Sequence, residues 1–189
     1  TVEFQLAGQN FVEVGYEWSP ERFSGIEFDD LRNWWLYFDS DFSERVRGGF
    51  FLQRERDIAR LTDPPSVGEG THLEVWATIR PWERLVIEPG LNYSELHDVE
   101  TDEELFSGYV LRVRTNLNFT RELFLRLVTQ WDDFDGQFNV EPLLTYRINP
   151  FTLFYVGSTQ VFNDYEEPRN DLVHTSRQFF AKLQYLFRM

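Results

Sequence analysis

Apolar and polar side chains alternate along most of this 189-residue chain, and the alternation is clearest in its last eleven residues. There the polar Lys182, Gln184 and Arg188 lie between the members of one apolar row: Phe179, Ala181, Leu183, Tyr185, Phe187 and Met189. A period of two residues is that of a β-strand, because successive side chains of a strand point to opposite faces. The pattern therefore predicts a strand with one apolar face and one mostly polar face.

The same pattern recurs along the chain and predicts ten strands. They cover residues 2–18, 26–39, 43–55, 71–80, 84–95, 105–118, 121–132, 137–148, 151–162 and 175–188. Soluble strands usually have about five or six residues, whereas roughly nine to eleven tilted residues cross a bilayer. The lengths thus favour an all-β fold, an antiparallel meander forming a transmembrane β-barrel of about ten long strands.

The parity of the alternation predicts which side chains face lipid. In one segment it is ambiguous, because Trp34-Trp35-Leu36-Tyr37-Phe38 is apolar on both faces. The residues that we expect to face lipid are Leu111, Val113, Leu117, Leu123, Leu125, Leu127, Leu144, Tyr146, Leu183 and Tyr185.

The connections between these strands alternate in length, as they do in outer-membrane barrels. Short turns are expected at 40–42, 81–83, 119–120 and 149–150, and longer links at 19–25, 56–70, 96–104, 133–136 and 163–174. Pro89 and Pro142 fall inside strands, where a proline removes a ladder hydrogen bond. We expect a bulge or an unpaired strand edge at these two positions.

Composition narrows the class of protein further. The chain has 17% aromatic residues but no run of eighteen apolar ones, so it contains no transmembrane helix pattern. It has no cysteine, which excludes disulfides and thiolate metal sites. The formal net charge of −14 argues against nucleic acid as a partner. The chain starts at Thr1 without a signal peptide, so we expect it to be a processed chain or a C-terminal fragment.

Three segments carry a family resemblance: HTSRQFFAKLQYLFRM, YRINPFTLFYVGSTQ and FTRELFLRLVTQW. They resemble the C-terminal region of Gram-negative outer-membrane proteins in which a carbohydrate-binding-like β-sandwich precedes a large barrel of unassigned function. The resemblance covers roughly residues 105–189. It implies that this single 189-residue barrel domain is the C-terminal portion of a longer chain. It implies no catalytic residues, and Met189 departs from the usual terminal Phe.

Charged side chains gather on the polar faces of the predicted strands. In a narrow barrel they would fill the lumen and pair across it, or line a passage for anionic solutes. The residues predicted to line the lumen are Arg45, Arg47, Glu74, Arg80, Glu88, Arg112, Arg114, Glu122, Arg126, Glu141, Arg147 and Lys182.

The predicted outer loops are strongly acidic. Carboxylates are the ligands that Ca²⁺ and Mg²⁺ prefer, so Asp132, Asp133 and Asp135 in WDDFDG are a candidate site for a loosely bound divalent cation. The spacing lacks the distal Glu of an EF-hand loop, and solvated charge is the competing interpretation. No other cofactor is expected.

Two further features point to functions of other classes. His97-Asp98 and Asp132-Asp133 resemble the His and Asp pairs of ten-stranded outer-membrane proteases, which would make the protein a surface hydrolase. Aromatic residues near the strand ends are typical of interfacial girdles. They also fit a sugar-stacking platform; the residues concerned are Trp18, Trp34, Trp82, Tyr93, Trp131 and Tyr155.

From the sequence we therefore predict a non-enzymatic protein of the bacterial outer membrane. It would act as a passive, porin-like channel or as a structural scaffold. A surface glycan-binding or glycan-import component is the first alternative, and an outer-membrane hydrolase is the second. The expected partners are outer-membrane lipid, lipopolysaccharide, and other outer-membrane or periplasmic proteins.

Overall fold

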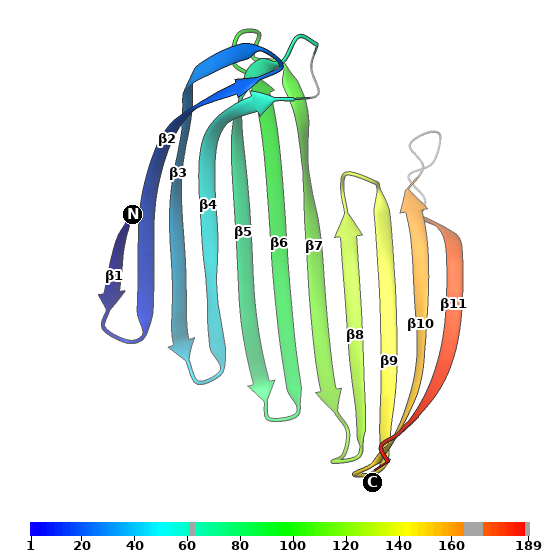
Figure 1. Cartoon of the computed structure of the whole chain (residues 1–189). Helices are drawn as coiled ribbons and strands as arrows, with labels where there is room; N and C mark the ends of the chain where they lie inside the picture. The colour runs from blue at the N-terminus through cyan, green and yellow to red at the C-terminus, as the bar shows by residue number, and fades with distance from the viewer. Residues whose placement is uncertain (61–62, 165–171, 188–189) are drawn as a thin grey trace. The chain divides into compact units, whose positions relative to one another are not determined.

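The computed structural model describes residues 1–60, 63–164 and 172–187. They form eleven β-strands in one sheet, and the strand order follows the sequence from β1 to β11 (Figure 1). In the described part of the chain, no helix is long and apolar enough to cross a membrane. The strands are β1 (Val2–Leu6), β2 (Asn10–Phe23), β3 (Ile26–Ser43), β4 (Val46–Ala59), β5 (Ser66–Trp82), β6 (Leu85–Asp98), β7 (Glu104–Asn118), β8 (Leu123–Asp132), β9 (Gln137–Asn149), β10 (Thr152–Asp164) and β11 (Leu172–Tyr185).

The all-β antiparallel meander is confirmed, with eleven described strands where about ten were expected. The segment 2–18 is a hairpin rather than one strand, because the chain turns at residues 7–9. Gly8 and Gln9 have φ of 81° and 61°, and Asn10 Nδ2 donates to the carbonyl oxygen of Ala7 at 2.6 Å. The turn leaves the even-numbered residues of both strands on one face, so the alternation continues through it and hides it.

Several strands also run further than predicted. The link expected at 19–25 is a turn of only Ser24 and Gly25, with φ of 50° and 83°, the mirror-image turn that matches the twist of a hairpin. The link expected at 56–70 shrinks to 60–65. The turn expected at 40–42 lies at 44–45 instead, because a register shift between Asp41 and Ser43 lets β3 continue.

The contacts divide the chain into two compact units. Unit 1 comprises Thr1–Trp76 and Leu91–Tyr109, and unit 2 comprises Ala77–Gly90 and Val110–Met189. β5, β6 and β7 pass from one unit to the other. The single-domain organisation stays a prediction.

In unit 1, direct strand partners place two different sets of side chains on the two faces. Rows of partners across β2, β3 and β4 define the apolar face: Val12–Phe38–Phe50 and Val14–Leu36–Leu52. The alternate rows define the polar face, as in Glu17–Asn33–Glu55. The ambiguous run is thereby resolved, since Trp34, Leu36 and Phe38 lie on the apolar face while Trp35 and Tyr37 lie on the polar one.

In unit 2, the register confirms the predicted parity. Leu117 is paired with Leu125, Leu125 with Leu144, and Leu144 with Val156. On the same reasoning all ten residues expected to face lipid share one face of β7–β11. This apolar face is open, as Leu144 is 39% and Leu183 64% exposed.

Aromatic rings on the polar faces cover glycines of the neighbouring strand. Trp35 lies over its direct partner Gly15, and Phe180 lies over its direct partner Gly157. A Cβ on Gly157 would meet the Phe180 ring at 2.7 Å. Rings over glycines fill space that the sheet would otherwise leave open and help to fix the strand register. This explains why apolar residues occur at polar positions of the pattern.

Prolines inside strands coincide with irregular pairing. Pro20 of β2 falls at the register shift between Ser19 and Glu21. At Pro142 the β9–β10 register passes from Leu143–Gly157 directly to Val140–Gln160. The missing N–H of Pro142 therefore interrupts the ladder to β10, where we had expected a bulge or an unpaired edge.

A small hydrophobic core lies at one end of unit 1, where β2 turns into β3 and where β4 and β6 end; we call this the outer end, because the sequence predicts its connections to be outer loops. Phe28, Leu31 and Ile58 are buried there, with Phe23 and Val67 packed against them. The guanidinium of Arg60 makes two hydrogen bonds to Glu21, at 2.8 and 3.1 Å, and lies over the Phe23 ring. The outer end is thus a packed structure, in which strand extensions that we had predicted to be loops supply Phe23, Ile58 and Val67.

Candidate functional site

Most of the residues predicted to line a lumen lie on the polar faces. In unit 2 the register places Arg112, Arg114, Arg126, Glu141, Arg147 and Lys182 there. Glu88 belongs with them, because its Oε2 lies 3.7 Å from Arg114 Nη1 and accepts a hydrogen bond from Asn116 Nδ2 at 3.1 Å. Arg80 and Glu74 are an even number of residues apart in β5, so they lie on the same face of that strand. That this face lines a lumen stays a prediction.

In unit 1 the polar face carries Arg47 and Glu74. Arg47 donates to Asp39 at 2.9 Å and lies 3.4 Å from Asp41, both on β3. Glu74 Oε1 lies 3.1 Å from His72 Nε2, within hydrogen-bonding distance. These ion pairs join neighbouring strands or residues of one strand, whereas we expected pairing across a lumen.

Two of the predicted lumen residues do not lie on a strand face. Arg45 is in the turn between β3 and β4, and Glu122 is in the connection between β7 and β8. Both predictions were wrong in placing these side chains on strands. The cause for Arg45 is the longer β3, which moves the turn from 40–42 to 44–45.

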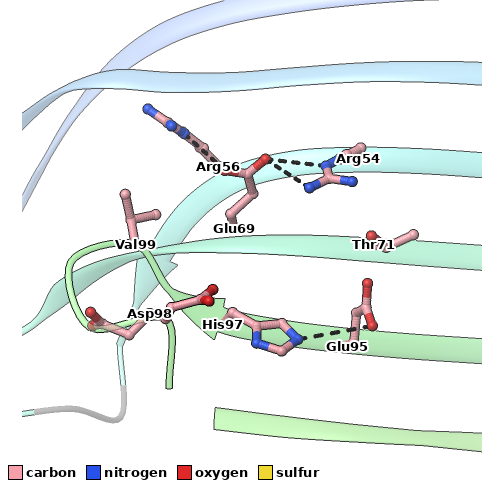
Figure 2. Close-up of a pocket in the computed structure, with 9 residues that line it drawn as sticks. Arg54, Arg56, Glu69, Thr71, Glu95, His97, Asp98 and Val99 are labelled. Carbon is pink, nitrogen blue, oxygen red and sulfur yellow. Dashed lines mark hydrogen bonds and ion pairs between the residues drawn. The ribbon is translucent and has the colours of Figure 1, made fainter. Parts of the chain in front are cut away.

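An open hollow of about 330 Å³ lies at the outer end of unit 1 (Figure 2). It is lined by side chains of β4, β5 and β6 and of the connection after β6: Arg54, Arg56, Glu69, Thr71, Glu95, His97, Asp98, Val99 and Asp102. A second hollow of about 370 Å³ shares Arg54, Arg56 and Glu69 with the first, and adds Tyr16, Arg32, Trp34 and Glu55. The two hollows thus meet at one cluster of charges.

Arginines and carboxylates alternate through this cluster. Glu69 lies between Arg54 and Arg56 in Figure 2; its oxygens are 3.1 Å from Arg54 Nη2 and 3.4 Å from Arg56 Nε. Arg56 Nη1 also donates to Asp30 at 2.6 Å, and Asp30 lies 3.6 Å from Arg32. Three guanidinium groups therefore share two carboxylates across β3, β4 and β5, and we call these five residues the arginine cluster.

His97 and Asp98 lie beside this cluster, and each contacts other residues. His97 Nε2 is 4.0 Å from Glu95, whose Oε2 accepts a hydrogen bond from the Tyr93 hydroxyl at 2.6 Å. Asp98 accepts hydrogen bonds from the Ser66 hydroxyl and from the backbone N–H groups of Glu100 and Thr101. These bonds, above all that from Ser66, lower the pKa of Asp98 to about 2. So weak a base is poorly suited to activating water, and Asp98 organises the turn that follows β6.

The acidic residues predicted to hold a divalent cation lie at the end of β8 and in the connection 133–136. Asp132 Oδ1 accepts a hydrogen bond from the backbone N–H of Phe134 at 3.2 Å, while Asp133 and Asp135 are exposed. Within the described ranges, no group of three or more His, Asp or Glu side chains is placed to hold a metal ion. Loose binding in this loop stays a prediction. Glu166, Glu167 and Asp171 of the last acidic loop, and the terminal Arg188 and Met189, lie outside the described residues.

Sequence reasoning missed the arginine cluster, although the signal was present. Arg56 and Glu69 fell inside a predicted link, so they were not assigned to a face. Yet Arg32 has the parity of the apolar residues that follow it in β3, and Arg54 and Arg56 have the parity of the apolar residues that precede them in β4. Charges that continue an apolar row mark the point at which that face stops being apolar.

Comparisons with known proteins give little beyond this geometry. No protein-family model and no curated protein matches the chain. Among solved structures, a KdgM porin in complex with disordered oligogalacturonate matches 99% of this chain and 90% of its own, with a TM-score of 0.39 and 11% sequence identity. A likeness this distant transfers no function, and the resemblance to barrels that follow a β-sandwich stays a prediction.

Proposed function

We propose that this chain is part of an outer-membrane β-barrel that acts as a passive channel or as a scaffold for partner proteins. The observation that carries the proposal is the open apolar face of β7–β11, which lies opposite a polar face that carries charges on β7, β8, β9 and β11. A soluble sheet would bury such a face, whereas a bilayer is a solvent for it.

Strand length supports the same proposal. β3 has 18 residues and β5 has 17, more than the roughly nine to eleven that a bilayer requires, so the strands can cross and still extend beyond it. A sheet in lipid must pair its edge strands, since no water satisfies their N–H and C=O groups. This requirement makes a barrel the fitting architecture for a meander that faces lipid.

The charges on the polar face of unit 2 bear on what would pass. Basic residues outnumber acidic ones among the predicted lumen residues there: Arg80, Arg112, Arg114, Arg126, Arg147 and Lys182 stand against Glu88 and Glu141. A passage lined in this way would favour anions. Acidic oligosaccharides belong to that class of solute, so the glycan-import alternative differs from the passive channel only in its substrate.

Single-cysteine variants test the orientation, because the native chain has no cysteine to remove. We expect a spin label at Leu125→Cys to be accessible to oxygen dissolved in lipid, and a label at the adjacent Arg126→Cys to be accessible to a water-soluble relaxing agent. The protein would be reconstituted in vesicles and its folding checked by heat-modifiable migration. Water accessibility at both positions would reject the barrel.

Conductance in planar bilayers then separates a channel from a scaffold. A channel should show discrete anion-preferring steps, and Glu141→Gln should increase that preference because it removes a negative charge from the polar face. Block by an acidic oligosaccharide and not by a neutral one of equal size would favour glycan import. If the protein inserts correctly but shows no conductance, the scaffold function is favoured over the channel.

A further inference from the structure

The apolar face of unit 1 changes character in successive rows toward the outer end. Direct partners across β2, β3 and β4 give first Val14–Leu36–Leu52, then Tyr16–Trp34–Arg54, and then Trp18–Arg32–Arg56. Successive rows are two residues apart, or roughly 6.8 Å along the strands. Over this short distance one face passes from aliphatic to aromatic to arginine side chains.

This order is that of one leaflet of a membrane. Aliphatic side chains suit the hydrocarbon, rings with a polar edge suit the interface, and guanidinium groups suit the headgroups. The rings are accessible, since Tyr16 is 63% and Trp18 60% exposed, and the Trp18 indole N–H is anchored on the Asp29 carbonyl oxygen at 3.0 Å. The gradient therefore has an orientation, with the arginine cluster on the headgroup side.

The arginine cluster still has capacity for an anion. Its contacts within the described residues use Nε and Nη2 of Arg54, Nε and Nη1 of Arg56, and Nη2 of Arg32. A guanidinium group has five N–H donors, so each arginine keeps donors that these contacts do not use. The three guanidinium groups also exceed the two carboxylates by one charge.

We propose that the arginine cluster, with Tyr16 and Trp34, is a docking site for the phosphorylated headgroup of an outer-leaflet lipid. The phosphate would bind the guanidinium groups of Arg54 and Arg56, because each group is a planar fork of N–H donors that matches the phosphate oxygens. The headgroup would lie in the hollow between Trp34 and Glu69, and the acyl chains would descend over Leu36 and Leu52. This inference rests on the proposed function, because it needs the apolar face of unit 1 to meet lipid.

The test uses the refolded full chain in non-ionic detergent micelles, with the diphosphorylated glucosamine lipid A as the probe. Binding would be measured by native mass spectrometry and by quenching of tryptophan fluorescence. We expect Arg54→Gln/Arg56→Gln to weaken binding about 30-fold, since a basic residue near a membrane surface contributes about a fivefold factor. Arg84→Gln/Arg121→Gln removes the same charge from exposed turns elsewhere and should leave the affinity unchanged.

A variant that is expected to tighten binding shows that the loss of affinity in Arg54→Gln/Arg56→Gln does not come from unfolding. Glu69→Gln removes the carboxylate that occupies Arg54 and Arg56, so it should tighten lipid A binding about fivefold. Dephosphorylated lipid A should bind weakly to the native protein and to the variants alike.

Three outcomes would overturn the inference. They are equal affinity of the native protein and Arg54→Gln/Arg56→Gln, weaker binding by Glu69→Gln, and full displacement of lipid A by inorganic phosphate. The last would mean a site for free phosphate. Failure of the native protein to insert into vesicles would instead reject the proposed function, so the two failures are distinguishable.

Discussion

At the residue scale, contacts between a large ring and a missing side chain fix the register of neighbouring strands. Trp35 over Gly15 illustrates this, because the ring occupies the space of a Cβ and its indole N–H donates to Glu13 Oε1 at 3.0 Å. The glycine and the hydrogen bond thus hold the Trp35 ring against the polar face of the sheet, and this face does not become apolar like the opposite one. The same arrangement at Phe180 and Gly157 makes a quantitative test possible.

We expect Gly157→Val to destabilise the protein by about 1–3 kcal/mol, the usual cost of forcing extra atoms into a packed site. Its Cβ would meet Phe180 at 2.7 Å and Leu143 at 3.1 Å. In a Phe180→Ala background the same substitution should cost little, because the ring that it clashes with is gone. Guanidinium unfolding in detergent measures both, and an equal cost in the two backgrounds would show that the ring does not matter.

The turn after β6 should weaken at low pH because of Asp98. The hydrogen bonds that Asp98 accepts lower its pKa to about 2 from the ordinary value of 3.8. A carboxyl group whose pKa is lower in the folded state stabilises that state above the unfolded pKa, and this contribution is lost as the pH falls from 3.8 toward 2. The stability difference between the native protein and Asp98→Asn should therefore shrink across that range. A difference that is independent of pH would contradict the role given to the carboxylate.

At the element scale, alternation predicted faces well and boundaries poorly. Every residue expected on the apolar face of unit 2 lies on one face, because an alternation of period two is preserved wherever the pairing keeps a regular register. The alternation also failed to reveal the hairpin turn at 7–9, since Leu6 and Asn10 keep the same parity across the turn. The strand ends at the outer end were predicted to be loops, because charged residues such as Arg56 and Glu69 are typical of loops. Only strand pairing, which a single sequence does not contain, brings them together as a cluster.

Substitution of one residue on each face of β8 tests the face assignment by stability. Leu125 pairs with Leu117 and Leu144 on the apolar face, so Leu125→Arg should cost about 2–4 kcal/mol if it lies near the bilayer midplane. The adjacent Arg126→Gln lies on the polar face and should change stability much less. Unfolding of both variants from vesicles gives the comparison, and a larger cost for Arg126→Gln would reverse the two faces.

At the scale of the whole molecule, a net charge of −14 coexists with basic clusters on particular faces. The carboxylates concentrate in the connections and strand ends, where Glu100, Asp102, Asp133 and Asp135 are exposed. The arginines concentrate on the strands, where they meet carboxylates or face the predicted lumen. If the chain lies in an outer membrane, the acidic connections would stand beside anionic lipid headgroups, and a divalent cation could bridge the two.

We therefore expect Ca²⁺ to bind weakly at the connection after β8, with an affinity that falls as salt rises. Asp133 and Asp135 are exposed, and exposed carboxylates gain little from a single contact and are screened by salt. Calorimetry of the folded protein with Ca²⁺, repeated after Asp132→Asn/Asp133→Asn/Asp135→Asn, measures the contribution of this connection. Asp102→Asn/Glu103→Gln/Glu104→Gln removes the same charge elsewhere and is the matched control. An equal loss of binding in both triple variants would show that Ca²⁺ responds to overall charge and not to this loop, whereas tight, salt-insensitive binding would mean a built site.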